Sequence, residues 1–393
     1  MIVAGEASGD MHAAGLVDAI RSFNPLVTFS GLGGELMQKN GVELYANLTR
    51  HAVVGFWEAF KHLSFFKQNF DLILEKITET RALAVILVDY PGFNLRLARE
   101  IKRRGIKTKI IYYISPQVWA WKESRVELIK KIVDKMLVIL PFEKEFYAHR
   151  GMDVEFVGHP LLDQVKATKA PEAVLSSLGL LEKSRDTIAL LPGSRQKEIE
   201  RLLPAMLAAA RILFKDNSLL QFILIKAPTV DQGLIERHLG TIPFPLKVVG
   251  QDRYNALNAV EFCVVASGTA TLETAILGKP MVIVYKTSLL TWSLAKGLIR
   301  LPSIGLVNVI AGKKIVPECI QFEATAQKVA SQIQSLYADQ AKIQTIKEEL
   351  KKVKAALGSP GASRRAAQVV LEVIQRKVGT APTFPDNAFS DRK

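Results

Sequence analysis

Short apolar runs alternate with longer segments of helical periodicity along most of this chain, and this alternation constrains its fold more than any other feature. The runs at residues 84–88, 109–114 and 187–191 are each followed by a polar turn and then by a helical pattern. Strands that alternate with helices in this way pair in a parallel sheet that helices cover on both faces. The sequence therefore predicts an α/β fold.

The alternation pauses once and then restarts, which indicates two domains. Residues 166–187 are polar and irregular, and further apolar runs come after them. We expect two doubly wound, Rossmann-like domains facing a central cleft, over residues 1–163 and 164–344, with ligands bound beyond the carboxyl ends of the strands. Helices at about 345–377 could pack back on the first domain, and residues 378–393, which lack periodicity, are expected to form a disordered tail.

Charge and cysteine content narrow the choice of partner and compartment. The 393 residues carry a formal net charge of +14, which favours anionic partners such as an acidic membrane surface or a phosphorylated substrate. No known nucleic-acid motif accompanies the basic stretch at 96–109, so we expect no nucleic-acid partner. The chain has two cysteines, no secretory signal pattern and no apolar run approaching ~18 residues, and we therefore expect a cytoplasmic protein.

The sequence offers no pattern for a metal or for a dinucleotide cofactor. The six histidines form no ligand cluster, and no Asp-x-Asp pair occurs. Leu36 stands where a dinucleotide fingerprint beginning at Gly31 needs a glycine. We expect no cofactor and no metal, so that cationic groups and helix ends would have to stabilise a leaving group.

The segment at 266–273 is the clearest candidate for a ligand loop, because it joins an apolar strand to a short helix through small residues. Ser267, Gly268 and Thr269 would let a ligand approach the backbone, and N–H groups at the helix start attract phosphate. Glu273 follows one helical turn after Thr269 and could accept hydrogen bonds from ribose hydroxyls. Ordinary helix capping explains the same residues, so this segment alone leaves both interpretations open.

A second strand-to-helix turn makes a nucleotide diphosphate the better interpretation. Gly193 and Ser194 can present backbone N–H groups, and Arg195 adds a bidentate donor suited to phosphate. A capped surface helix with an exposed arginine is the alternative. Two such loops in one domain support each other, since a diphosphate needs several donors.

Acidic residues follow the strands of the first half. Asp89 leaves the apolar strand 84–88 and is a candidate general base, with N-capping of the next helix as the alternative. Glu6, Ser8 and Asp10 follow the first apolar run and could bind a sugar or position the base, or serve only the turn and helix cap.

Two apolar helical segments suit contact with acyl chains at an anionic membrane surface. The first contains Trp57 and Phe60, and the second contains Leu290 and Trp292. Ordinary core helices would show the same pattern.

Taken together, these residues resemble the lipid A disaccharide synthases, which are bacterial inverting glycosyltransferases of the GT-B type. The specific matches are Gly-Glu-Ala-Ser-Gly-Asp at 5–10 and Ser-Pro-Gln-Val-Trp-Ala-Trp at 115–121. Further matches lie at 140–143, 158–159, 190–195, 267–273 and around Asn308. The departures are mild: Tyr-Pro-Gly at 90–92 stands where some members carry Ala-Pro-Asp, and Cys-Ile at 319–320 varies a Leu-rich stretch.

The resemblance implies a reaction. Transfer of 2,3-diacylglucosamine from UDP-2,3-diacylglucosamine to 2,3-diacylglucosamine 1-phosphate (lipid X) would give a β-1,6-linked disaccharide 1-phosphate and UDP. Asp89 would deprotonate the acceptor 6-hydroxyl, while Arg195 and the 267–269 loop would hold the departing diphosphate. Trp119, Asn308 and Gln321 join Glu6, Ser8 and Asp10 as candidates for sugar and acceptor contacts.

The resemblance also implies where the enzyme works, and two alternative functions stay open. It would act in the cytoplasm, peripherally associated with the inner membrane. If the C-terminal helices were exchanged between two chains a homodimer would form, and the sequence leaves the oligomeric state open. A non-hydrolysing UDP-N-acetylglucosamine 2-epimerase-like enzyme needs the same nucleotide site without an acyl-binding surface. A non-catalytic membrane-surface protein could also have kept the fold.

Overall fold

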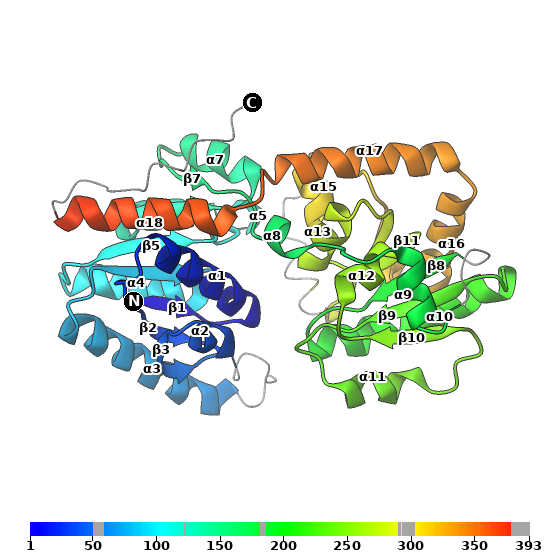
Figure 1. Ribbon diagram of the computed structural model, residues 1–393, viewed down its shortest axis with the longest axis horizontal. Helices are drawn as coiled ribbons and strands as arrows, with labels where there is room; N and C mark the ends of the chain where they lie inside the picture. The colour runs from blue at the N-terminus through cyan, green and yellow to red at the C-terminus, as the bar shows by residue number, and fades with distance from the viewer. Residues whose placement is uncertain (50–58, 122, 181–185, 290–291, 293–302, 379–393) are drawn as a thin grey trace. The chain divides into compact units, whose positions relative to one another are not determined.

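The computed structural model describes residues 1–49, 59–121, 123–180, 186–289, 292 and 303–378, and the chain divides into two compact α/β units (Figure 1). The first unit comprises Met1–Pro160 together with Ser359–Lys393, and the second comprises Leu161–Gly358. Each unit has its own parallel sheet and its own hydrophobic core.

The first unit is built on a seven-stranded sheet with the order β3-β2-β1-β4-β5-β6-β7. Its strands are β1 (Ile2–Ala4), β2 (Ser30–Gly33), β3 (Glu43–Asn47), β4 (Ala84–Val88), β5 (Lys109–Tyr113), β6 (Lys135–Val138) and β7 (Glu155–Phe156). Its helices are α1 (Ala7–Phe23), α2 (Glu35–Lys39), α3 (Ala59–Glu79), α4 (Pro91–Arg103), α5 (Val118–Trp121), α6 (Arg125–Ile132), α7 (Pro141–Ala148) and α18 (Ala362–Val378).

The second unit is built on a six-stranded sheet with the order β10-β9-β8-β11-β12-β13. Its strands are β8 (Thr187–Leu191), β9 (Gln221–Ile225), β10 (Leu246–Val249), β11 (Phe262–Ala266), β12 (Met281–Tyr285) and β13 (Glu318–Ile320). Its helices are α8 (Leu161–Gln164), α9 (Pro171–Ser177), α10 (Gln196–Asp216), α11 (Gln232–Leu239), α12 (Arg253–Asn258), α13 (Thr269–Ile276), α15 (Leu306–Ala311), α16 (Ala326–Tyr337) and α17 (Gln340–Ala356), with a 3₁₀ turn η1 at Gln321–Glu323.

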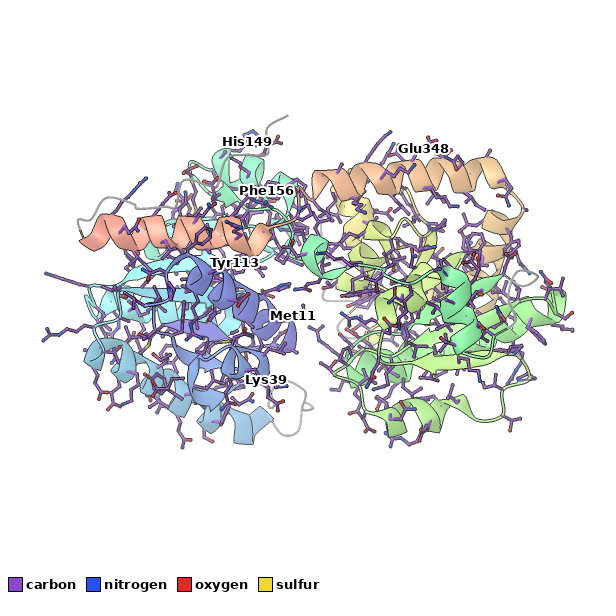
Figure 2. The ribbon with its side chains drawn as sticks, in the orientation of Figure 1. Met11, Lys39, Tyr113, His149, Phe156 and Glu348 are labelled. Carbon is purple, nitrogen blue, oxygen red and sulfur yellow. The ribbon has the colours of Figure 1, made fainter. Side chains whose placement is uncertain are left out.

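The central strands are apolar along their whole length because helices cover both faces of each sheet. Every residue of β4, β8 and β11 is buried. Figure 2 shows the side chains: Tyr113 at the end of β5 is fully buried, whereas Lys39 at the end of α2 is exposed. The α/β class predicted from the alternation of apolar runs is confirmed.

The two sheets follow the same rule of strand order. In each, the first three strands in sequence are added toward one side of the sheet, and the later strands are added toward the other side. The reversal falls between β1 and β4 in the first unit, where Ala4 pairs with Val88, and between β8 and β11 in the second, where Leu191 pairs with Val265. Loops that follow these strand pairs flank the crevice in which doubly wound folds bind ligands.

The C-terminal helices belong to different units. Helix α18 packs along α1, and its Arg365 donates from Nε to the carbonyl of Val157 at 2.9 Å. Helix α17 packs on α13 and α15 of the second unit, with Ile343, Ile346 and Leu350 in that core. Of the range 345–377 that we expected on the first domain, α18 therefore lies there, while the part within α17 lies on the second unit. The expected tail lies outside the described residues, apart from Val378 at the end of α18.

Candidate functional site

Asp89 stands at the carboxyl end of β4 in a constrained backbone. Asp89 and Tyr90 both have left-handed φ angles, 47° and 48°, which cost non-glycine residues about 1–3 kcal/mol each. The Asp89 N–H donates to the carbonyl of Tyr113 at 3.0 Å, and the Asp89 carbonyl accepts from Asn94 Nδ2 at 2.8 Å and from the Tyr112 hydroxyl at 2.5 Å. These bonds hold the backbone of Asp89 at the sheet edge, as a positioned general base requires.

The end of β1 lies beside Asp89 because Gly5 leaves room for the ring of Tyr90. A Cβ added at Gly5 would come within 2.1 Å of that ring. Glu6 follows directly, and burial, with the charge of Glu6 as a smaller cause, raises the pKa of Tyr90. Glu6 and Asp89 therefore share one edge of the sheet, at the reversal of strand order.

Asp10 has a structural task within this edge. Its carboxylate is buried and accepts hydrogen bonds from the N–H groups of Gly34 (2.8 Å), Leu36 (3.0 Å) and Met37 (3.1 Å) at the start of α2. Ser8 is exposed in the first turn of α1. Sugar contacts for Ser8 and Asp10 stay predictions.

Trp119 is buried against α7. Its Nε1 donates to Glu143 Oε1 at 3.2 Å, and its ring meets Phe142 edge-on with centroids 4.8 Å apart. Glu143 Oε2 accepts from the N–H of Leu140 at 3.1 Å. Burial raises the pKa of Glu143 to about 8 despite these donors, and the charge of Asp89 adds a smaller contribution of the same sign. Sequence reasoning quoted Glu143 only within a matching segment, and an acceptor contact for Trp119 stays a prediction.

In the second unit, the loop after β8 carries Gly193, Ser194 and Arg195. Gly193 has a φ of 114°, and a Cβ there would lie 2.6 Å from Glu198 Oε2. That oxygen accepts from the N–H groups of Ser194 (3.2 Å) and Arg195 (3.3 Å). The Arg195 side chain is 68% exposed, with Nη1 3.4 Å from Glu198 Oε1. Glu198, which sequence reasoning missed, occupies the donors predicted for phosphate, so an incoming diphosphate would have to share or displace it.

The loop after β11 lies at the same edge, because β8 and β11 are neighbours. Gly268 has a φ of 149°, and nothing lies within 4 Å of an added Cβ, so the position demands glycine for its backbone and leaves open space. The Ser267 hydroxyl donates to the carbonyl of Ile304 at 3.1 Å, and the exposed Thr269 begins α13. The open space at Gly268 suits a ligand near the start of α13.

Glu273 meets two residues that sequence reasoning missed. Its Oε1 accepts from Arg253 Nη2 at 3.1 Å and from the Tyr254 hydroxyl at 2.9 Å, while Arg253 Nη2 also donates to the Tyr254 hydroxyl at 2.6 Å. Burial, and after it the charge of Glu273, raises the pKa of Tyr254 to about 12. Arg253 and Tyr254 begin α12, and they hold the Glu273 carboxylate in one orientation. The only signal in the sequence was their place after β10, at the carboxyl edge.

Asn308 and Gln321 are engaged within the second unit. Asn308 Nδ2 donates to Glu318 Oε1 and to the carbonyl of Val316, and its Oδ1 accepts two backbone N–H groups. Gln321, with a φ of 54°, bonds through its amide to both the N–H and the carbonyl of Thr287. In this structure both amides hold neighbouring segments, and their predicted ligand contacts stay predictions.

The predicted acyl-chain segments lie mostly outside the described residues, which include neither Trp57 nor Leu290 nor the side chain of Phe60. Trp292 is described, and its N–H donates to the carbonyl of Ser288 at 2.8 Å. Over the part of the chain that the structure describes, no helix is long and apolar enough to cross a membrane. Within the same part, no three His, Cys, Asp or Glu residues gather as metal ligands, and metal independence stays a prediction.

Two doubly wound α/β units, each with a parallel sheet whose strand order reverses once, place this chain in the GT-B fold class. Solved structures of similar fold include the Staphylococcus aureus MnaA–UDP co-structure (TM-score 0.63, 12% identity, 98% of both chains). Another is the UDP-GlcNAc 2-epimerase from Neisseria meningitidis bound to UDP-GlcNAc (TM-score 0.62, 11% identity, 92% of this chain and 97% of that one). A third is the calicheamicin glycosyltransferase CalG4 (TM-score 0.58, 16% identity, 97% of this chain and 98% of that one). Identities this low show the fold alone.

Sequence comparison then shows the family. The family model for lipid-A-disaccharide synthetase matches residues 1–373. The lipid-A-disaccharide synthase of Syntrophus aciditrophicus is 43% identical over 377 residues, which is 96% of this chain and 98% of the relative. That of Geobacter sulfurreducens is 41% identical over 378 residues, covering 96% and 98%. The chain belongs to the lipid-A-disaccharide synthase family and is a glycosyltransferase, as the motifs at 5–10 and 115–121 predicted.

Proposed function

We propose that this glycosyltransferase transfers 2,3-diacylglucosamine from UDP-2,3-diacylglucosamine to the 6-hydroxyl of 2,3-diacylglucosamine 1-phosphate. The observation that carries the proposal is the family match over residues 1–373, combined with Asp89 at one strand-order reversal and Arg195 at the other. The epimerase-like alternative shares only the fold with this chain.

The proposed reaction is a single displacement with inversion. Asp89 accepts the proton of the acceptor 6-hydroxyl while that oxygen bonds to the anomeric carbon of the donor sugar. The bond from the anomeric carbon to the UDP oxygen breaks, and UDP leaves with the electron pair. The left-handed backbone at Asp89 and Tyr90 supports this role, because strain of this kind gathers at functional sites.

The departing diphosphate needs cationic and N–H donors. Arg195 and the start of α13 would supply them, and phosphate would compete with Glu198 for the N–H groups of Ser194 and Arg195. Glu273, oriented by Arg253 and Tyr254, would accept hydrogen bonds from the ribose hydroxyls. We propose that no metal takes part.

The enzyme would work at the anionic inner surface of the cytoplasmic membrane, where its acylated substrates reside. The formal charge of +14 supports this location. Charge reversal at Lys296 and Arg300, the basic residues of the Trp292 segment, is expected to reduce co-sedimentation with anionic vesicles. Unchanged co-sedimentation would place the membrane face elsewhere.

The proposed reaction is tested by incubating the protein with UDP-2,3-diacylglucosamine and lipid X in mixed micelles. The products are then identified by mass spectrometry. The expected products are UDP and a tetraacyl disaccharide 1-phosphate with a β-1,6 linkage. Epimerisation of water-soluble UDP-N-acetylglucosamine without disaccharide formation would support the rival enzyme. Absence of UDP release with any acceptor would leave the non-catalytic alternative.

A further inference from the structure

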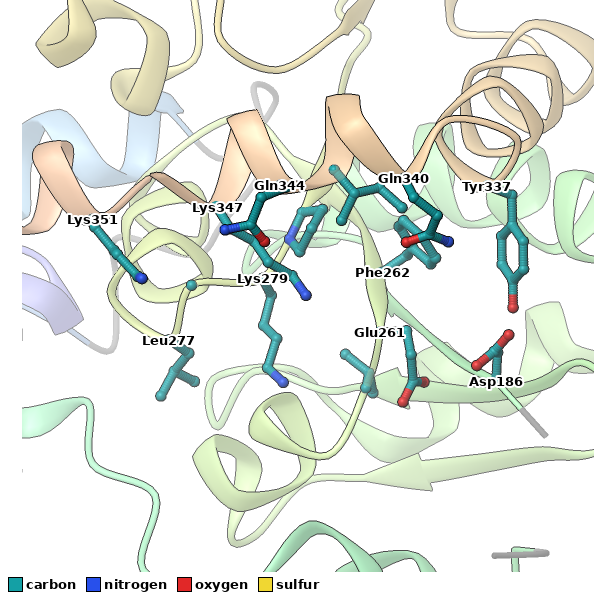
Figure 3. A pocket seen from close by; sticks show the side chains of 14 residues that line it. Asp186, Glu261, Phe262, Leu277, Lys279, Tyr337, Gln340, Gln344, Lys347 and Lys351 are labelled. Atoms are coloured by element: carbon teal, nitrogen blue, oxygen red, sulfur yellow. The ribbon is translucent and has the colours of Figure 1, made fainter. Parts of the chain in front are cut away.

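The second unit contains a cavity of about 610 Å³ away from the loops discussed above (Figure 3). It is lined by the residues that precede β8, β11 and β12 and by the facing side of α17. The predicted nucleotide loops follow the carboxyl ends of β8 and β11, so this cavity lies at the opposite, amino-terminal edge of the same sheet. Its size is within the range of small-molecule sites, about 300–1,000 Å³.

One end of the cavity is cationic. Lys279, from the turn before β12, and Lys347 and Lys351, from α17, line it. Among the described residues, none of the three ammonium groups makes an ion pair or a hydrogen bond. Burial lowers the pKa of the half-buried Lys279; the charges of Cys263 and Glu261 oppose that shift, and the charge of Lys347 adds to it. An anion placed between these two ammonium groups would offset both costs.

The other end is acidic and carries a buried hydroxyl. Asp186 and Glu261 line it, and Glu261 Oε2 accepts from the N–H of Thr187 at 2.6 Å. Desolvation raises the pKa of both carboxyls; for Glu261 the N–H of Thr187 and the charge of Lys279 oppose the shift, and the charge of Asp186 adds to it. The Tyr337 hydroxyl oxygen is buried without a hydrogen-bond partner among the described residues, and its ring packs on Phe262 with centroids 5.1 Å apart. A buried hydroxyl without a hydrogen-bond partner destabilises the folded state, and a ligand that bonds to it would remove that cost.

We propose that this cavity binds a small organic phosphate whose other end carries hydroxyl or amino groups. The phosphate would lie between Lys279 and Lys347, and the hydroxyl or amino groups would donate to Asp186 and Glu261 and bond to the Tyr337 hydroxyl. The ammonium groups of Lys279 and Lys347 argue against a metal cation as the occupant. The acidic end argues against a bare polyanion such as a nucleic-acid backbone.

The cavity and the predicted nucleotide loops share two elements. Strand β11 runs from Phe262 in the cavity to Ala266 before the Ser267 loop, and α13 runs from Thr269 to the turn that carries Lys279. A ligand in the cavity would therefore touch the far end of the helix whose start is predicted to hold UDP.

The test is calorimetric titration of the full chain, first with UDP and then, at saturating UDP, with glucose 6-phosphate, inorganic phosphate and glucose as probes. Saturation with UDP is intended to fill the loops that are predicted to bind phosphate, and the first titration reports separately whether nucleotide binds at all. Glucose 6-phosphate is expected to bind with a Kd below about 1 mM and at least about tenfold more tightly than either inorganic phosphate or glucose.

Variants locate the site. Lys279→Met and Lys347→Met are each expected to weaken glucose 6-phosphate binding at least about tenfold. Lys342→Met removes an exposed lysine of the same helix that does not line the cavity, and it should change nothing. Three results would overturn the proposal: no binding of glucose 6-phosphate, equal affinity for inorganic phosphate, or an unchanged affinity in both cavity variants.

Discussion

Each unit has one sheet edge where the strand order reverses. In the first unit this edge follows β1 and β4, and in the second it follows β8 and β11. The two edges present different groups, although the strand order around them is the same. The first presents the carboxylates of Glu6 and Asp89. The second presents a glycine-bearing loop, helix starts and the exposed Arg195. We therefore propose that one topology places a proton acceptor in one unit and donors to an anion in the other.

The two edges also differ in how their acidic groups are compensated. In the second unit Glu273 has a cation and a phenol within hydrogen-bond distance. In the first unit Glu143 is fully buried with only neutral donors, Trp119 and the N–H of Leu140, and burial raises its pKa to about 8. Among the printed donors, the carboxyl of Glu143 therefore has no cation, whereas the carboxylate of Glu273 has the guanidinium of Arg253.

The largest effect is expected at Asp89. Asp89→Asn keeps the shape of the side chain but removes the proton acceptor, so turnover should fall about 10²–10⁴-fold. The fall in turnover is measured as the initial rate of UDP release from UDP-2,3-diacylglucosamine in the presence of lipid X. The matched control is Asp71→Asn, which changes an exposed carboxylate of α3 and should leave the rate unaltered. Near-normal turnover of Asp89→Asn would remove this residue from the mechanism.

Arg195 tests the anion-binding edge. Arg195→Ala should weaken UDP binding by about 1.5–3 kcal/mol, the contribution of a hydrogen bond between charged groups. Lys197→Ala removes an exposed cation two residues along and serves as the control in the same titration. Equal losses in the two variants would mean that Arg195 contributes only to the general positive field.

Glu143 makes stability depend on pH. Its pKa is raised from the unfolded value of 4.5 to about 8, so the folded state binds more protons between these values, and stability should fall as pH rises through that window. Thermal unfolding between pH 5 and pH 6.5 should show Glu143→Gln losing about 1–2 kcal/mol less than the wild type. Glu145→Gln, an exposed position of the same helix, should follow the wild type. Identical pH slopes for Glu143→Gln and wild type would contradict the burial argument.

The smallest effect concerns Tyr254. Tyr254→Phe removes one hydrogen bond to Glu273 and should weaken UDP binding by about 0.5–1.5 kcal/mol. The loss should disappear when 2′,3′-dideoxyuridine diphosphate replaces UDP, because Glu273 then has no ribose hydroxyl to accept from. A loss of the same size with both nucleotides would show that Tyr254 does not act through ribose recognition.

Sequence reasoning reached the fold because the apolar runs at β4, β8 and β11 are local signals of buried parallel strands. It could also place Asp89, Arg195 and Ser267 at carboxyl ends of strands, since that follows from their position after such runs. It could not find contacts between residues distant in the chain. Examples are the caps that Asp10 provides to α2 and the pairing of Arg253 with Glu273.

Glu198 and α17 show two further limits. The sequence placed Gly193, Ser194 and Arg195 in a phosphate loop without foreseeing that Glu198, at the third position of the helix, folds back onto their N–H groups. The apolar faces of α17 and α18 look alike in sequence, and only tertiary packing assigns one helix to each unit.

The central claim is that the two edges divide the work, with the proton acceptor in the first unit and the anion donors in the second. Equilibrium titration of UDP into Asp89→Asn tests it most directly. The division predicts a Kd within about twofold of wild type, beside an Arg195→Ala variant weakened at least about tenfold. Loss of UDP affinity in Asp89→Asn as large as that in Arg195→Ala would contradict it.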